Sequence, residues 1–100
     1  MITLYFYNMD ILQDDNGLKG RFYIKVDDKE EAEMTYTWAG KDRIIIDHTA
    51  VNDALRGKNA GKQMVLQAVA FAREKHIKII PLCPFANSVF NKMPELSDVL

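Results

Sequence analysis

The sequence has a single cysteine, no long apolar run and almost no net charge, and each shortage excludes a class of protein. One cysteine in 100 residues cannot form an internal disulfide, which excludes a disulfide-stapled secreted scaffold. No apolar run approaches the roughly 18–20 residues that span a bilayer, and no basic-then-apolar leader opens the chain. A formal net charge of −1 disfavours a general nucleic-acid surface, which is usually basic. We therefore expect a cytoplasmic protein, one domain over residues 1–100, that binds neither a membrane nor nucleic acid.

Alternation of apolar and polar residues predicts three strands in the first half of the chain. They are expected at Met1–Asp10, Gly20–Val26 and Met34–Trp38. The run 13–17 is dense in turn formers, and its Asn16-Gly17 pair is a strong hairpin signal. A second turn is expected over residues 27–30. Short turns between successive strands predict an antiparallel meander.

The second half of the chain predicts a strand, a helix and a strand. Residues 43–51 include Ile44-Ile45-Ile46, which is apolar on both faces and suggests a central strand. Residues 61–75 carry apolar side chains at the i, i+3, i+4 spacing of a helix lying on a sheet. Residues 77–82 are expected as a fifth strand, parallel to the fourth through a right-handed crossover. Pro81 and Pro84 lack backbone donors, so pairing should fail near the end of this strand, as an open slot or as a simple strand terminus.

These elements together predict an α/β fold of the α+β kind. It consists of a mixed sheet with an antiparallel meander and then a β-α-β crossover. One main helix lies on the sheet, and residues 87–92 are expected to form a short C-terminal helix.

The segment Arg56–Lys62 joins the fourth strand to the main helix and has the layout of a phosphate cradle. The first N–H groups of a helix lack intrahelical partners, and the helix dipole places positive charge at the same end. Gly57 and Gly61 permit close approach of the backbone and positive φ, and Asn59 tolerates such a conformation. A capped loop with solvated lysines would have the same sequence pattern.

Two common nucleotide motifs do not fit this segment. A Walker A loop needs one more residue between Gly57 and Gly61, and Ser or Thr where Gln63 follows Lys62. The dinucleotide fingerprint G-x-G-x-x-G fails because Leu55 and Asn59 flank Gly57 at the required spacing. Nucleotide hydrolysis and dinucleotide redox chemistry are therefore disfavoured.

The segment resembles the Q/R-x-x-G-x-G/A pyrophosphate loop of the GNAT superfamily of N-acetyltransferases, with Arg56 first, Gly61 last and Asn59 in place of the middle glycine. Its surroundings are similar to the small YjdJ-type subfamily of GNAT-like proteins. The matching residues are Asp47-His48-Thr49, Ala72-Arg73, Pro81-Leu82-Cys83-Pro84-Phe85 and Met93-Pro94-Glu95. The resemblance covers nearly the whole chain, most clearly from Phe22 onward.

The resemblance implies a fold in which the fourth and fifth strands splay and the pantetheine arm of CoA threads between them. It implies acetyl-CoA as co-substrate, no metal, and transfer of acetyl to an amine or another small nucleophile. The residues it implies for CoA binding are Thr49, Ala50, Val51, Arg56, Gly57, Lys58, Asn59, Ala60, Gly61, Lys62, Pro84 and Asn87. A non-catalytic CoA or acyl-CoA binding module and a simple interaction domain remain as alternatives.

Cys83 and His48 are the candidates for chemistry. Cys83 follows the fifth strand and precedes a helix start, which lowers the pKa of a thiol, so it is either a nucleophile for an acetyl thioester or a buried inert residue. By alternation His48 shares a strand face with Ile44 and Ile46, where it is either a hydrogen-bonded core residue or the general base beside Cys83. A metal site is not expected, because Asp47, His48, His76 and Cys83 lack ligand spacing.

The sequence also departs from the larger family members. It has only a turn where they carry paired helices that help to bind the acceptor, and it has no room for their last two strands. The resemblance further aligns Phe90 with a family tyrosine that can protonate the departing CoA thiolate. The donor-binding half is thus expected to be present, and the identity of the acceptor stays open.

Overall fold

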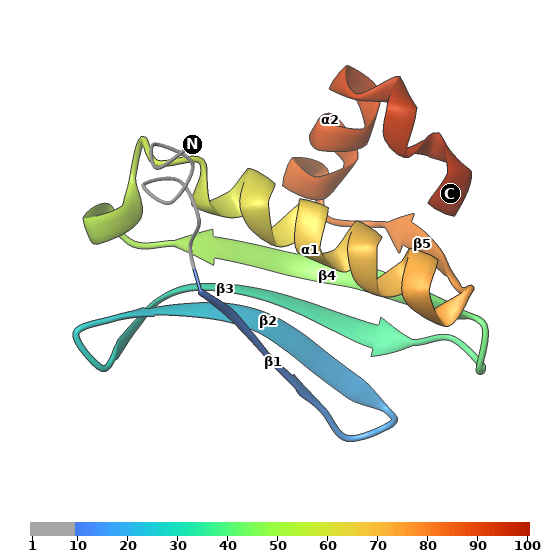
Figure 1. Ribbon diagram of the computed structural model, residues 1–100, viewed down its shortest axis with the longest axis horizontal. Helices are drawn as coiled ribbons and strands as arrows, with labels where there is room; N and C mark the ends of the chain where they lie inside the picture. Colours follow the sequence, from blue (N-terminus) through green and yellow to red (C-terminus); the bar gives the residue numbers. More distant parts are fainter. Residues whose placement is uncertain (1–9) are drawn as a thin grey trace.

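A five-stranded sheet forms the body of the protein, with helix α1 lying along one face (Figure 1). The computed structural model describes residues 10–100. The strands follow the order β1-β2-β3-β4-β5 in the sheet as in the sequence. In chain order the elements are β1 (Ile11–Asp15), β2 (Lys19–Val26), β3 (Lys29–Trp38), β4 (Arg43–Val51), η2 (Asp53–Leu55), α1 (Ala60–Lys75), β5 (Lys78–Pro81), α2 (Pro84–Lys92) and η3 (Pro94–Val99). The expected mixed α+β fold is confirmed.

The core lies between the sheet and α1, and it is built from the two periodicities of the sequence. In strands β2, β3 and β4 every second side chain points into the core, and α1 contributes the stripe of apolar side chains expected from its helical spacing. The buried residues of these elements are Phe22, Ile24, Ala32, Met34, Tyr36, Ile44, Ile46, Ala60, Gly61, Met64, Val65, Ala68, Val69 and Ala72. Full burial of a large apolar side chain is worth about 1.5–3 kcal/mol, so this face fixes where α1 begins and how it lies.

The two hairpins confirm the meander and correct its boundaries. Asn16-Gly17 forms the first turn, where Gly17 has φ +90° and Asn16 Oδ1 accepts the N–H of Lys19 at 2.8 Å. Residues 13–15, expected in that turn, belong to β1, because the three residues 16–18 are enough to reverse the chain. Asp27 and Asp28 alone make the second turn, both with positive φ, so residues 29 and 30 already lie in β3. The strand expected at Met1–Asp10 falls outside the described residues, apart from Asp10, which is not in a strand.

Strand β4 pairs with β3 along its length but with β5 only at its beginning. The parallel register runs from Arg43 opposite Lys78 to Ile46 opposite Pro81 and stops there. The N–H of Cys83 still bonds to the carbonyl of Ile46 at 2.9 Å, after which the chain turns into α2. The second half of β4 therefore has no strand partner on this side within residues 10–100, as Pro81 and Pro84 predicted.

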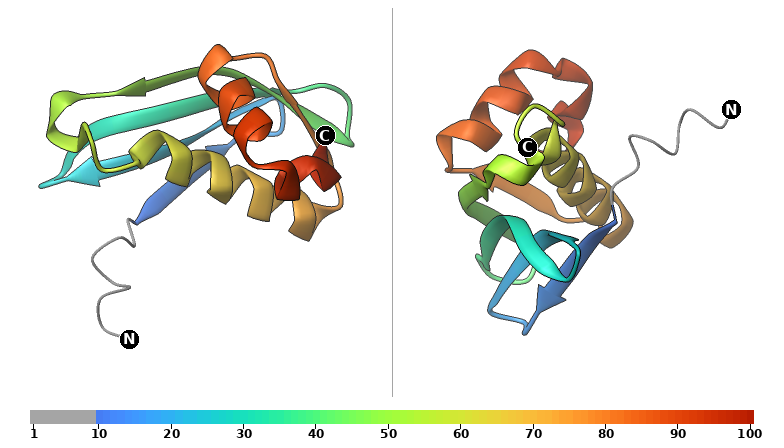
Figure 2. Two further views of the ribbon diagram at one scale, coloured as in Figure 1. Left: turned by 90° about the horizontal axis from the view of Figure 1, so that it is seen from above. Right: turned by 90° about the vertical axis from the view of Figure 1, so that its left-hand side faces the viewer.

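Helix α2 begins at Pro84, three residues before the expected start at residue 87. Proline suits the first helical position, because its φ is already helical and the missing N–H would have no intrahelical partner. Helices α2 and η3 pack beside α1 (Figure 2). Arg73 of α1 donates to Asp98 at 2.7 and 3.0 Å and so ties η3 to the main helix.

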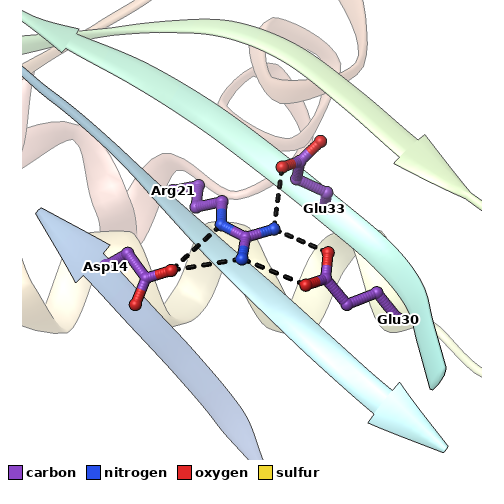
Figure 3. A network of polar contacts seen from close by, with 4 residues as sticks. All are labelled: Asp14, Arg21, Glu30 and Glu33. Carbon is purple, nitrogen blue, oxygen red and sulfur yellow. Dashed lines mark hydrogen bonds and ion pairs between the residues drawn. The ribbon is translucent and has the colours of Figure 1, made fainter. Parts of the chain in front are cut away.

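The sheet face that points away from α1 carries an ion cluster centred on Arg21 of β2 (Figure 3). Arg21 contacts Asp14 of β1 at 3.1 Å and, from β3, Glu30 at 2.6 Å and Glu33 at 3.1 Å. Hydrogen bonding to Glu30 is the main cause that raises the pKa of Arg21. Because the carboxylates are largely exposed, we assign the cluster to holding the register of three strands and little more. Within residues 10–100 no helix is long and apolar enough to cross a membrane.

Candidate functional site

The connection from β4 to α1 has the backbone that its sequence predicted. Gly57 has φ +79° and Asn59, the residue before α1, has φ +60°, both left-handed. The side chain of Asn59 makes no capping hydrogen bond. The first-turn N–H groups of α1 therefore remain available to an anion, together with the positive end of the helix dipole.

Gly61 is a glycine for a different reason from the one expected. It is the second residue of α1 and does not have positive φ. A Cβ placed on Gly61 would lie 2.6 Å from Cζ of Phe85, so the aromatic ring occupies the space that a side chain would need. This contact joins the beginning of α2 to the beginning of α1, and sequence reasoning did not find it because the two residues are distant in the chain.

A cavity of about 560 Å³ opens at this end of α1. Of the residues expected to bind CoA, it is lined by Thr49, Val51, Arg56, Gly57, Asn59, Ala60, Gly61 and Lys62. Ala50, Lys58, Pro84 and Asn87 do not line it. The side chain of Asn87 instead donates to the carbonyl of Pro81 at 3.5 Å, and Pro84 opens α2.

The other side of the cavity comes from α2 and was missed by the sequence. Phe85, Ser88, Val89, Lys92 and Met93 line it there, and Leu55 of η2 lines its floor. Phe85 and Met93 belong to the motifs that carry the family resemblance, but nothing in the sequence showed that they share a cavity with the start of α1.

The charge of the cavity has one sign. Its lining includes Arg56, Lys62 and Lys92 and no Asp or Glu among the described residues. Arg56 is exposed and pairs with Asp53 of η2 at 2.8 Å. Such an exposed pair is worth little, so Arg56 can exchange its carboxylate for another anion at small cost.

Cys83 lies two residues after the end of β5, directly before α2. Its residue exposure is 5%, and it does not line the cavity itself. The sulfur is 3.4 Å from Oγ1 of Thr49, which does. Burial raises the pKa of the Cys83 thiol, but hydrogen bonding from Thr49 and from the N–H groups of Ala86 and Phe85 outweighs it, and the pKa lies below its usual value.

The expected position of His48 is wrong. A β-bulge lies between the pairs Thr35–His48 and Tyr36–Ile46, so that Asp47 is an extra residue in β4. The bulge shifts the alternation by one residue, which turns His48 outward and Thr49 toward Cys83. His48 is exposed and does not share the face of Ile44 and Ile46, so its pairing with Cys83 loses its geometric basis.

The remaining polar candidates have structural partners. Asp47 accepts a hydrogen bond from Thr37 at 2.8 Å, and Asp53 pairs with Arg56. Phe90 is buried in the core, where a tyrosine hydroxyl would need a partner. In the described part of the chain, no group of three or more His, Cys, Asp and Glu residues is placed to hold a metal ion.

Comparison with known proteins matches the GCN5-related N-acetyl-transferase family over residues 21–99. The NMR solution structure of a GCN5-like protein from Staphylococcus aureus shares 38% sequence identity with a TM-score of 0.71, covering 92% of this chain and 87% of that one. Comparison with curated proteins gave no match.

Two more distant structures show the fold alone. A ribosomal-protein-alanine N-acetyltransferase from Brucella melitensis biovar Abortus 2308 is 16% identical with a TM-score of 0.65, covering 78% of this chain and 62% of that one. A predicted acetyltransferase from Clostridium acetobutylicum, crystallised with acetyl-CoA, is 18% identical with a TM-score of 0.60, covering 77% and 57%. Because the family match spans most of the chain and the S. aureus structure aligns with nearly all of it, this chain belongs to the GCN5-related N-acetyltransferase family.

Proposed function

We propose that the protein binds acetyl-CoA in the cavity at the start of α1 and transfers the acetyl group to an amine. The observation that carries the proposal is that every charged residue lining the cavity is basic, at a helix N-terminus whose N–H groups are uncapped. A volume of about 560 Å³ falls in the range of small-molecule sites. The interaction-domain alternative has no comparable support.

Different residues of the cavity suit the pyrophosphate and the pantetheine arm of CoA. Arg56, Lys62 and the first turn of α1 suit the pyrophosphate, because backbone N–H groups and positive charge converge there. Val51, Phe85 and Val89 give the same cavity apolar walls that suit the pantetheine arm. Lys58 stays in the proposal as an exposed charge near the phosphates rather than as a wall of the cavity.

For the transfer itself we propose a route through Cys83. Its thiolate attacks the acetyl carbonyl, an S-acetyl bond forms, and the thiolate of CoA leaves and takes a proton from solvent. The acceptor amine then attacks the acetyl-cysteine, the new amide loses its proton to solvent, and the Cys83 thiolate is restored. The competing route is direct attack of the amine on acetyl-CoA, with Cys83 packing beside the acetyl group.

A second candidate is a module that binds CoA or acyl-CoA without catalysis. The burial of Cys83, at 5% exposure and behind Thr49, is the observation that favours it.

The proposal also includes membership of the small YjdJ-type subfamily, and a cytoplasmic location, since a free thiol suits a reducing compartment.

Calorimetric titration with acetyl-CoA tests binding. Lys62→Glu reverses a charge in the cavity, and Lys75→Glu makes the same change at the other end of α1, where it serves as the matched control. We expect Lys62→Glu to weaken binding at least tenfold and Lys75→Glu to leave it nearly unchanged. No heat and no thermal shift at millimolar acetyl-CoA would reject the proposal.

Intact-mass measurement after incubation with acetyl-CoA separates the routes. An acetyl adduct that Cys83→Ala abolishes supports the covalent route. Product formation on an amine without any adduct supports direct transfer. Binding without product, over a panel of amine acceptors, supports the non-catalytic module.

A further inference from the structure

Thr49 stands between the cavity and the one cysteine of the chain. Its side chain lines the cavity, and its Oγ1 atom lies 3.4 Å from Sγ of Cys83. Thr49 reaches this place only because the bulge at Asp47 reverses the alternation of β4. Without the bulge, His48 would face the sulfur and Thr49 would face away.

The sulfur itself is held in place by backbone contacts. The N–H of Cys83 donates to the carbonyl of Ile46 at 2.9 Å, and its carbonyl accepts the N–H of Asn87 at 2.9 Å. The first bond fixes Cys83 to β4 and the second fixes it to the first turn of α2. The thiol makes no capping hydrogen bond to α2, but the N–H groups of Phe85 and Ala86 lie close enough to the sulfur to lower its pKa.

We propose that Thr49 is a positioning residue, whose hydroxyl donates to the Cys83 sulfur and holds it as a thiolate directly behind the part of the cavity wall that Thr49 forms. The inference rests on the proposed function and deepens it, because it assigns to β4 the group that readies the nucleophile. In the neutral state the thiol S–H donates to Oγ1 of Thr49. On ionisation the hydroxyl turns and donates to the sulfur, which needs no movement of the backbone.

A hydroxyl is the right kind of group for this position. It stabilises the thiolate without carrying a charge or taking the proton, and so raises the fraction of ionised sulfur at neutral pH. Hydrogen bonds to charged groups are stronger than those between neutral groups. Burial raises the pKa of Cys83, and the hydrogen bonds from Thr49 and from the start of α2 outweigh that increase.

The charged and titratable groups on the neighbouring elements are Arg43, Asp47 and His48 on β4, Lys62, Arg73, Glu74 and Lys75 on α1, Lys78 on β5 and Lys92 on α2. Hydrogen bonds, and not contacts with these charges, account for the lowered pKa of the thiol. The thiol titration should therefore depend on the Thr49 hydroxyl and little on ionic strength.

The test is a pH titration of the thiolate by its ultraviolet absorbance, with Cys83→Ala subtracted as the baseline for tyrosine ionisation. Thr49→Val keeps the branched shape and removes the hydroxyl, and Thr49→Ser keeps the hydroxyl. We expect the midpoint to rise in Thr49→Val and to return in Thr49→Ser. The rate of alkylation at neutral pH should fall about tenfold in Thr49→Val and recover in Thr49→Ser.

A thiolate midpoint in Thr49→Val equal to that of the wild type overturns the inference. An equal rise of the midpoint in Thr49→Val and Thr49→Ser also overturns it, because that result would assign the effect to packing. If Thr49→Val does not fold, Thr49→Ala carries the same expectation. Calorimetric binding of acetyl-CoA is measured on the same samples. If the thiolate midpoint does not rise in Thr49→Val but acetyl-CoA still binds, only the role of Thr49 is refuted. If the midpoint rises as expected but acetyl-CoA does not bind, only the proposed function is refuted.

Discussion

Asp53 should weaken ligand binding, because its ion pair with Arg56 competes with a contact between Arg56 and a phosphate. The two side chains meet at 2.8 Å and are 89% and 77% exposed. To contact a phosphate, Arg56 has to leave this carboxylate, and the free energy of the pair is subtracted from that of binding. Exposed pairs of this kind contribute about 0.2–1 kcal/mol. Asp53→Asn removes the competing charge and leaves the backbone carbonyl that accepts the N–H of Arg56.

We therefore expect Asp53→Asn to bind acetyl-CoA about 1.4- to fivefold more tightly, since 1.4 kcal/mol is a tenfold change. Calorimetric titration at low and high salt measures it, and the gain should shrink as salt screens the pair. The matched control is Asp42→Asn at the opposite end of β4, where Asp42 lies 3.5 Å from Arg43 and is also exposed. That variant should bind as the wild type does.

A double-mutant cycle tests whether the gain in affinity comes from the release of Arg56. In the Arg56→Ala background there is no pair to release, so Asp53→Asn should change the affinity much less than in the wild type. Unchanged or weaker binding in Asp53→Asn alone would show that Arg56 does not exchange its partner for a phosphate. Equal effects in both backgrounds would assign the gain to the lost negative charge rather than to Arg56.

Three further predictions concern the fold. Gly20→Ala should destabilise it by about 2 kcal/mol or more, because the new Cβ would lie 2.3 Å from the ring of Tyr36, which is 1% exposed; an unchanged Tm would refute this contact. Burial raises the pKa of Asp15, but hydrogen bonds, chiefly from the Tyr36 hydroxyl, lower it further. The stability that ionised Asp15 contributes is present above the pKa of Asp15 in the unfolded chain, and it is lost as the pH falls through the pKa of Asp15 in the folded protein. The loss of unfolding free energy in Tyr36→Phe, measured in urea, should therefore become smaller below about pH 4. A loss that stays constant with pH would contradict this prediction. Asn59→Ala should lose about 1 kcal/mol at φ +60°, whereas Asn59→Gly should lose almost nothing, and thermal unfolding compares the two.

Several parts of the fold followed from the sequence because their causes are local. The strands of the meander alternate with a period of two, and α1 repeats its apolar residues with the period of a helix, so each element carries its own buried face. Asn16-Gly17, Pro81 at the end of β5 and Pro84 after it act through their own backbone preferences. The family loop was visible for the same reason, since Arg56, Asn59 and Gly61 lie within six residues of one another.

The tertiary structure decided which side chains meet. The bulge at Asp47 arises from how β4 pairs with β3, and it placed Thr49 rather than His48 against Cys83. The ring of Phe85 covers Gly61 only because α2 packs beside α1. Both depend on contacts between residues distant in the chain, and periodicity along one element carries no information about its neighbour. The sequence by itself therefore determined the family and the elements from β2 onward, while packing between β4, α1 and α2 determined the cavity and the partner of Cys83.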